Sequence, residues 1–428
     1  AAPAADLMGL YREAQVQDAQ YAGAKAQYIG TQERLPQGRA LLLPNASFSA
    51  GYNYNWLQAT YNNPLFRSGN YDFYGYNYGI TVTQPLYRPQ NSTVYEQAKT
   101  QVKQAESQLS LAAQDLMVRV SQAYFDVLLA RSNLSTVRSQ KSALAEQLEQ
   151  AKRNFVVGTA TITDQREAQA RYDLVVAQEI AAVNELEVKN RALEVLIGHP
   201  VSGPLAGLRL PITLNSPAPN DMGVWVEQAY QSSLEVQFAL QALELAKQEI
   251  ERTRGGHMPT LDAVGSVNDT YAANSAFGVG SDIRQAAIGL QFVLPLYQGG
   301  AVSSQIREAV AKQERARQDL ENARRTVAQR TREAFLGVTS GLAQVSALEQ
   351  AVASTELQLE ATKLGQEVGV RTAVDVLNAE QQLSSAQRDL NQAIYNTILN
   401  QLKLKAAVGR LAERDLSDVN NLLKEEVQ

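Results

Sequence analysis

The chain has 428 residues, a formal net charge of −5 and no cysteine. A mildly acidic chain without a basic block is not typical of nucleic-acid-binding proteins, so we expect no nucleic-acid partner. Two histidines and no cysteine are too few for a site of three or four converging nitrogen and sulfur donors, so neither a metal nor another cofactor is expected.

In chain order, the predicted elements begin with a helix at about 5–35 and strands at 45–56 and 73–84. Apolar and aromatic side chains such as Tyr52 lie on one strand face, and polar ones such as Ser47 lie on the other. Alternation over strands of this length is typical of membrane barrels. The alternative is a soluble sandwich with its apolar faces inward. We favour the barrel, because the polar faces carry Asn, Ser, Gly and Thr in place of Lys and Glu.

A long helix is predicted at 89–157, followed by a shorter helix at 164–197. Apolar residues recur along 94–148 at a helical spacing, Lys141 alone breaks this stripe, and no Pro or Gly interrupts 90–157. At about 1.5 Å per residue such a helix extends close to 100 Å. Average helices have about 11–12 residues, so this one is predicted to project from the strands instead of folding into a compact domain.

After a proline-rich linker at 199–219, the same order of elements returns. We predict a helix at about 221–253, strands at 260–268 and 285–294, a long helix at 299–364 with Gly337 and Gly341 as weak points, a helix at 373–408 and a C-terminal equatorial tail. Pro85-Leu86-Tyr87 recurs 210 residues later as Pro295-Leu296-Tyr297. This repetition predicts two structural repeats, 1–215 and 216–428.

Four strands are too few to close a barrel, because the smallest bacterial barrels have about eight. An open sheet edge in lipid would leave backbone groups without hydrogen-bond partners. Several copies of the chain are therefore needed. Two copies would supply eight strands and three would supply twelve, and strand number alone leaves this choice open.

The chain resembles the TolC family of outer-membrane channel-tunnel proteins over nearly its whole length. The resemblance rests on LPLYQGGAVSSQ at 294–305, VGTATITD at 157–164 with ARYD at 170–173, and VGVRTAVDVLNA at 368–379. It implies a mixed fold: a homotrimer with a twelve-stranded membrane β-barrel in the outer membrane of a Gram-negative bacterium, and a long α-helical barrel that extends as a tunnel into the periplasm.

The resemblance also implies a function and partners. The trimer would be a passive exit duct for type I protein secretion, multidrug efflux or both, gated at its periplasmic end. A periplasmic adaptor protein and an inner-membrane transporter, ABC or proton-driven, would open it. What passes through the duct cannot be read from the residues.

Gate residues follow from the same resemblance. In the family, the position of Asp375 lines the closed entrance and selects ions, and a second aspartate one turn later corresponds to Asn378 here. One acidic ring in place of two should weaken cation binding. Asp164 and Arg371 match positions of a latch between helix pairs, and the family's tyrosine at the latch is Gln366 in this chain.

Each half turns at a glycine after its long helix, where glycine reaches a positive φ without strain. We expect the two turns to contact the adaptor through Val157, Gly158, Thr159, Val368, Gly369 and Val370. The next helices open with Thr161-x-x-Asp164 and Thr372-x-x-Asp375, which are capping-box patterns. Capping alone is therefore an alternative role for both aspartates, and a solvated surface pair is the alternative for Arg371 and Asp164.

Three other functions fit the sequence less well. An enzyme is not predicted, because His199 and His257 lie in glycine-rich loops and Gly278-x-Gly280 lacks the third glycine of a dinucleotide-binding loop. A general diffusion porin shares the barrel but has no use for helices of about 100 Å. A soluble coiled-coil scaffold leaves the alternating strands unexplained.

Overall fold

The computed structural model describes residues 5–63, 65, 68–159, 161–201, 203–208, 212–275 and 279–424. It contains two compact units. The helical unit comprises Ala1–Ala26, Ser107–Phe238 and Glu321–Gln428, and the strand unit comprises Gln27–Glu106 and Ala239–Leu320. Each unit takes segments from both halves of the sequence, so the repeats 1–215 and 216–428 stay a prediction. Gly278, named above, lies outside the described residues.

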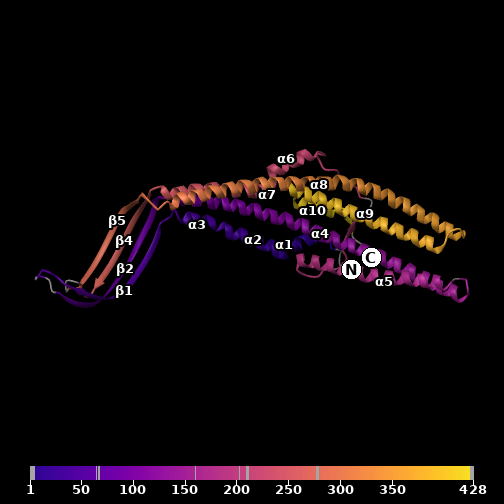
Figure 1. Ribbon diagram of the computed structural model, residues 1–428, viewed down its shortest axis with the longest axis horizontal. Coiled ribbons are helices and arrows are strands. Elements are labelled where there is room, and N and C mark those ends of the chain that lie inside the picture. Colours follow the sequence, from indigo (N-terminus) through magenta and orange to yellow (C-terminus); the bar gives the residue numbers. More distant parts are fainter. Residues whose placement is uncertain are drawn as a thin grey trace. The chain divides into compact units, whose positions relative to one another are not determined.

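The strand unit is built on one antiparallel sheet of four strands (Figure 1). Its strands, in spatial order, are β1 (Asn45–Ala59), β2 (Gly69–Tyr87), β4 (Thr260–Ala272) and β5 (Ser281–Val293). Because β2 pairs with β4, the two hairpins continue one sheet and do not face each other as the layers of a sandwich. Each of the four strands is longer at its hairpin-loop end than the alternating segment that predicted it. Many of the extra residues are polar, and their backbone groups form hydrogen bonds between strands in the same way.

The apolar face of this sheet is open to its surroundings. Tyr52 opposes Tyr76, which opposes Tyr271 on the next strand, so the aromatic residues lie side by side across three strands. Along β5 the side chains of Ile288 and Leu290 are 92% and 70% exposed. In the described part of the chain, nothing packs over this row.

A buried ion pair holds the sheet where β2 leads into the first long helix. Arg88 donates from Nε to Oδ1 of Asp262 at 2.8 Å and from Nη2 to Oδ2 at 2.5 Å. The Asp262 side chain is only 5% exposed. This paired geometry ties the end of β2 to β4, because both oxygens of the carboxylate are used.

The helix predicted at 5–35 is three helices, α1 (Leu7–Gln17), α2 (Ala19–Gln32) and α3 (Arg34–Ala40). Asp18 interrupts the first two with a ψ of 115°, and its side chain accepts a hydrogen bond from the Tyr21 N–H. The segment predicted as one helix at 221–253 is also divided, into α6 (Met222–Ser232) and α7 (Leu234–Arg254), and a 3₁₀ turn at Gly255–His257 follows. Short polar residues at Asp18 and Ser233 compete for backbone hydrogen bonds and allow such breaks.

Four long helices form two antiparallel hairpins in the helical unit. The first hairpin joins α4 (Pro89–Val156) to α5 (Ile162–Ile197), and the second joins α8 (Ala301–Glu367) to α9 (Ala373–Ala407). Lys141, the polar exception in the apolar stripe, pairs with Glu179 of α5 at 2.6 Å. The helix α8 begins two residues later than predicted, because Gly299 and Gly300 have φ values of 61° and 80°.

Gly337 and Gly341 do not interrupt α8; instead, they allow α9 to approach closely. A Cβ atom built at Gly341 would lie 2.3 Å from Oγ1 of Thr397, and one at Gly337 would lie 2.6 Å from Nδ2 of Asn400. No helix in the described part of the chain is both long and apolar enough to cross a membrane.

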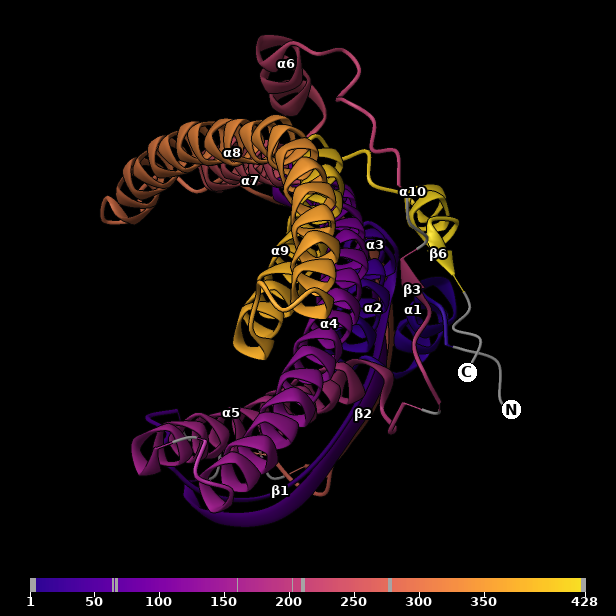
Figure 2. The same cartoon turned by 90° about the vertical axis from the view of Figure 1, so that its right-hand side faces the viewer.

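The core of the helical unit joins the helices to a small outer layer. Leu116 and Tyr124 of α4 pack with Ile394 and Ile398 of α9. The Tyr124 hydroxyl donates to the carbonyl of Ala206 at 2.6 Å, and burial raises the pKa of this tyrosine. Figure 2 shows the outer layer, which contains α1, α10 (Glu413–Asn420) and the paired short strands β3 (Gly207–Leu208) and β6 (Leu423–Lys424). The proline-rich linker and the C-terminal tail thus meet through β3 and β6.

Candidate functional site at the two helical turns

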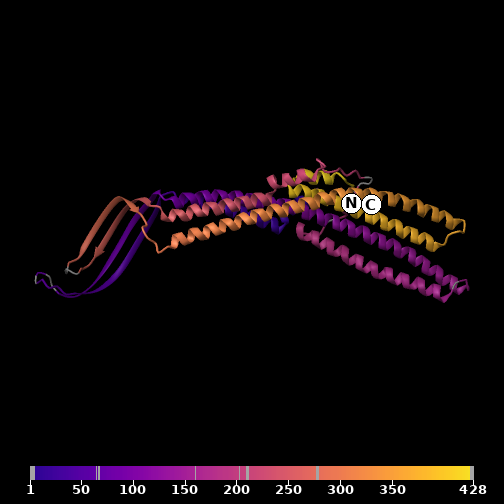
Figure 3. The same cartoon turned by 45° about the horizontal axis from the view of Figure 1, so that its top comes forward.

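The two hairpins of the helical unit end in turns of the same construction (Figure 3). Gly158 and Gly369 have φ values of 77° and 78°. In the first turn Thr159 N–H bonds the carbonyl of Asn154 at 2.8 Å, and in the second Val370 N–H bonds the carbonyl of Gly365 at 2.9 Å. The N–H groups of Gly158 and Gly369 also donate, each to a carbonyl three residues earlier at 3.0 Å. Together these hydrogen bonds form the Schellman motif, which satisfies the last carbonyls of a helix.

Both aspartates close a capping box, as their spacing predicted. Oδ2 of Asp164 accepts from the N–H and the hydroxyl of Thr161, both at 2.8 Å. Oδ2 of Asp375 accepts from the N–H of Thr372 at 2.8 Å and from its hydroxyl at 2.9 Å. Backbone and hydroxyl hydrogen bonds from the threonine lower the pKa of each aspartate, so both are carboxylates at neutral pH.

The second turn adds a positive charge and a polar hollow. Arg371, Asp375 and Asn378 line one cavity of about 320 Å³ together with Gln358 and Gln382. The charge of Arg371 contributes to the lowered pKa of Asp375, after the hydrogen bonds of Thr372. The sequence-predicted gate residues of the second hairpin are therefore neighbours in space.

The latch residues are not joined within one chain. Among the described residues, no ion pair links Arg371 to Asp164, and the side chain of Gln366 lies exposed at the end of α8. The polar links found between long helices join helices of the same hairpin, as with Lys363 and Glu380 at 3.0 Å. The predicted contact between Arg371 and Asp164 is therefore not present in the structure of the single chain.

The tips of the turns present apolar side chains to their surroundings. Val157, Val368 and Val370 are 70%, 67% and 78% exposed, and Thr159 is exposed as well. Most of the surface of each of these valines is therefore uncovered by the described residues. Such exposed apolar tips favour a contact surface for another protein.

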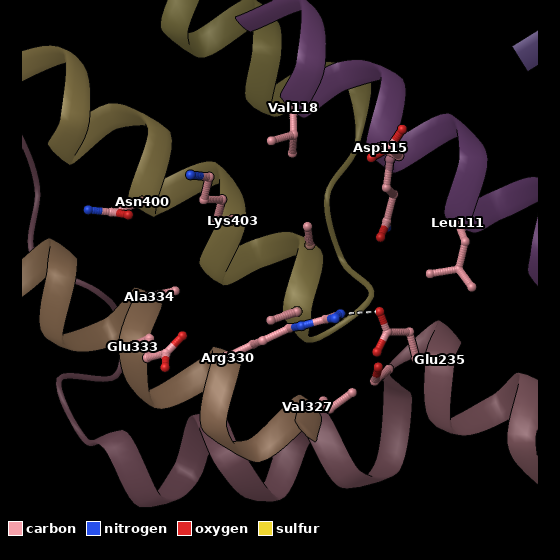
Figure 4. Close-up of a pocket in the computed structure, with 14 residues that line it drawn as sticks. Leu111, Asp115, Val118, Glu235, Val327, Arg330, Glu333, Ala334, Asn400 and Lys403 are labelled. Carbon is pink, nitrogen blue, oxygen red and sulfur yellow. Dashed lines mark hydrogen bonds and ion pairs between the residues drawn. The ribbon is translucent and has the colours of Figure 1, made fainter. Parts of the chain in front are cut away.

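A second cavity, of about 410 Å³, lies far along the helices from the turns, among α4, α7, α8 and α9 (Figure 4). Arg330 of α8 reaches Glu235 of α7 as an ion pair on its wall. Asp115, also on the wall, pairs with Arg119 one turn along α4 at 2.6 Å. These two ion pairs occupy part of the wall, and apolar side chains from the packed helices line much of the remainder. Among the described residues, no group of three or more acidic, histidine or cysteine side chains is placed to hold a metal.

Sequence reasoning missed two charged clusters in the strand unit. One is the Arg88–Asp262 pair described above. The other is formed by Asp269 and Arg284, which lie 2.7 Å apart on the apolar face. Both residues lie outside the predicted strands 260–268 and 285–294, although their positions continue the alternation of β4 and β5 and so carried the signal.

The comparisons with known proteins agree with one another. Residues 10–199 and 225–410 match the outer membrane efflux protein family. The outer membrane protein TolC of Vibrio cholerae serotype O1 is 35% identical over 426 residues, covering 98% of this chain and 94% of that protein. The proteases secretion protein PrtF of Dickeya chrysanthemi is 32% identical over 422 residues, covering 97% and 90%.

The fold is also found in solved structures. The CmeC outer membrane channel of Campylobacter jejuni matches with a TM-score of 0.79 at 17% identity, over 98% of this chain and 90% of that one. The predicted resemblance to TolC proteins is thereby confirmed. The chain belongs to the outer membrane efflux protein family, and its place is the outer membrane.

Proposed function

We propose that three copies of the chain form an exit duct. Three sheets of four strands would close a twelve-stranded barrel in the outer membrane, and the long helices would form the tunnel through the periplasm. The main support for this proposal is the four-stranded sheet. Among the described strands, its outer strands β1 and β5 each pair with one other strand. A sheet exposed to lipid must close, because unsatisfied backbone groups there cost several kcal/mol each.

The duct would serve type I protein secretion, multidrug efflux or both, as a passive channel and not as an enzyme. Support comes from the relatives, since one is named for the secretion of proteases and the matching family is named for efflux. A periplasmic adaptor and an inner-membrane transporter, ABC or proton-driven, would supply the energy and the opening signal. The exposed valines of the two turns support the adaptor contact at Val157–Thr159 and Val368–Val370.

The gate would lie at the same turns. Asp375 is ionised and lines a cavity with Asn378, which supports a ring of three carboxylates at the periplasmic entrance. Arg371 of one copy and Asp164 of the next would form the latch, with Gln366 at the position of the family's tyrosine. The support is the exposure of these side chains beside the two turns.

Closure of the sheet can be tested with cysteine pairs, because the chain has no cysteine of its own. One cysteine is placed on β1 and one on β5, stepping along both strands. Within one chain β2 and β4 separate these strands by about 14 Å at roughly 4.8 Å per strand, which is too far for a disulfide. Oxidation at the matching register should therefore give covalent trimers on a denaturing gel.

A matched control places the cysteines at Ser47 and Thr81, which oppose each other within one chain. This pair should leave the chain monomeric on the same gel. If every β1–β5 pair also stays monomeric, neighbouring sheets do not meet edge to edge and the trimeric barrel is wrong. Conductance steps of the purified protein in planar bilayers would then decide whether it forms a channel by another route.

A further inference from the structure

A charged cluster interrupts the apolar face of the sheet. Asp269 of β4 opposes Arg284 of β5, and Nε of Arg284 donates to Oδ2 of Asp269 at 2.7 Å. On the other side, Asp269 opposes Tyr78 of β2. Ile288 and Leu290 share this face with Arg284, because residues an even number apart on a strand point the same way.

The cluster differs from its apolar neighbours in charge. The side chain of Arg284 is 82% exposed and that of Asp269 is 12% exposed. An arginine on the lipid face of a barrel costs most at the middle of the bilayer and little near the interfaces. A cluster that contains an exposed arginine is therefore compatible with the edge of the hydrocarbon and not with its middle.

The apolar band that begins at the cluster has the height of a membrane. From Arg284 to Leu294 this face of β5 and its continuation carries only Ala286, Ile288, Leu290 and Phe292 before Leu294. These ten steps cover about 34 Å at about 3.4 Å per residue, and a strand tilt of about 40° shortens this to roughly 26 Å. The lipid-facing band of bacterial barrels is about 25 Å tall.

Aromatic side chains lie at both ends of the band, as in the girdles of membrane barrels. Near the cluster, the rings of Tyr76 and Tyr271 stack with centroids 4.9 Å apart, and Tyr78 stacks on Tyr76 at 6.4 Å. At the opposite end, beyond Leu294, Tyr297 is 88% exposed. The band thus has an aromatic and polar boundary on each side.

We propose that Tyr78, Asp269 and Arg284, the boundary cluster, mark the loop-side edge of the hydrocarbon on the β4–β5 hairpin and contact the polar headgroups of that leaflet. Asp282 and the end of the hairpin then lie outside the hydrocarbon, although β5 continues through them. This inference rests on the proposed membrane function and adds to it a lipid-contact surface with a defined depth.

Fluorescence quenching by spin-labelled lipids tests the depth, because single cysteines can be labelled without background in this chain. Ile288→Cys and Leu290→Cys place a fluorophore in the band, Asp282→Cys places it beyond the cluster, and Ala287→Cys places it on the opposite face as a matched control. Each labelled protein is reconstituted into phosphatidylcholine vesicles that carry a nitroxide either on the acyl chain or on the headgroup.

The acyl-chain nitroxide should quench the labels at 288 and 290 several-fold more than those at 282 and 287. With the headgroup nitroxide, the label at 282 should be quenched more strongly than the label at 290. Strong acyl-chain quenching at 282, equal to that at 288, would overturn the boundary while leaving the membrane sheet intact. Quenching at 287 equal to that at 288 would also overturn it, since the two faces would not differ. No acyl-chain quenching at any position would instead contradict the proposed membrane function itself.

Discussion

At the scale of single residues, the aspartates of the turns combine a structural role with a proposed gating role. The capping box at each turn uses only Oδ2, so Oδ1 takes no part in it. The capping hydrogen bonds also lower the pKa of each aspartate and so favour the carboxylate form. The two roles are therefore compatible, because a capped aspartate still carries the negative charge that a selective entrance needs.

The charge of Asp375 gives a prediction about ion selectivity. Asp375→Asn removes one carboxylate per chain at nearly constant size, so cation selectivity should fall and the reversal potential in a salt gradient should move toward zero. Asn378→Asp, in the same cavity, should move it in the opposite direction. Reversal potentials in planar bilayers measure both changes.

A control for this series is Asp173→Asn, an exposed aspartate of α5 that is hydrogen-bonded by Gln169 and lies away from the turns. It should leave the reversal potential unchanged. If neither Asp375→Asn nor Asn378→Asp changes the reversal potential, the proposed ring of Asp375 carboxylates does not set the ion selectivity.

The latch gives a second prediction. Arg371→Ser and Asp164→Ala should each raise the single-channel conductance of the closed protein. If both act by breaking one contact between copies, the double variant should open the channel no further than the stronger single variant, because coupled residues are not additive. Arg388→Ser, which removes a surface arginine of α9 paired with Asp389, should not change conductance. Conductance at the wild-type level in the double variant would count against the latch.

At the scale of elements, the periodicity of apolar residues predicted whether a segment is a helix or a strand better than it predicted where each element ends. The long helices could be predicted because apolar residues follow one helical stripe for many turns, and the strands because their side chains alternate. The breaks at Asp18 and Ser233 could not be predicted in this way, since both positions fit a helical pattern and break it through local hydrogen bonds and dihedral angles. The strand ends were missed because polar residues pair there without alternating.

The close packing of α8 on α9 gives a third prediction. At a solvated helix position, alanine is about 1 kcal/mol more favourable than glycine. At Gly341 the added Cβ would meet Thr397, which is fully buried. Overpacking of this kind typically costs about 1–3 kcal/mol, so Gly341→Ala should lower the thermal unfolding temperature.

The matched control is Gly23→Ala in α2, where an added Cβ meets nothing within 4 Å. This variant should be as stable as the wild type or more stable by up to about 1 kcal/mol. Equal thermal unfolding temperatures for the two variants would show that α8 and α9 do not approach closely at Gly341.

The lipid-facing sheet gives a fourth prediction. Ile288→Arg puts a charge in the middle of the apolar band and should destabilise the folded protein in vesicles by about 2–4 kcal/mol. Ala287→Arg puts the same side chain on the opposite face and should cost much less, because that face would line an aqueous lumen. Urea titration in lipid vesicles measures both. A larger loss from Ala287→Arg than from Ile288→Arg would reverse the assignment of the two faces.

The candidate site was partly predictable for a related reason. Capping boxes and glycine turns have short sequence patterns, so Thr161, Asp164, Thr372 and Asp375 could be placed from the sequence alone, and the structure has both boxes. The proposed gate and latch would depend on contacts between copies, which no local sequence pattern encodes. The boundary cluster depends on strand register, which joins Asp269 to Arg284 only once the hairpin has formed.

At the scale of the whole molecule, a single chain leaves strand edges and apolar surface without partners among its described residues. Its sheet has two outer strands and an uncovered apolar face. The two residues of the proposed latch do not form an ion pair with each other within the described chain. All three features are satisfied together if copies of the chain stand side by side around an axis. The proposed barrel needs more than one copy of the chain, and the resemblance to TolC proteins favours three.

The number of copies is therefore the most direct measurement. Native mass spectrometry of the detergent-solubilised protein should give three times the 46.8 kDa of the chain, about 140 kDa. A monomer, or a complex of two chains, under the same conditions would contradict closure of the sheet by three copies.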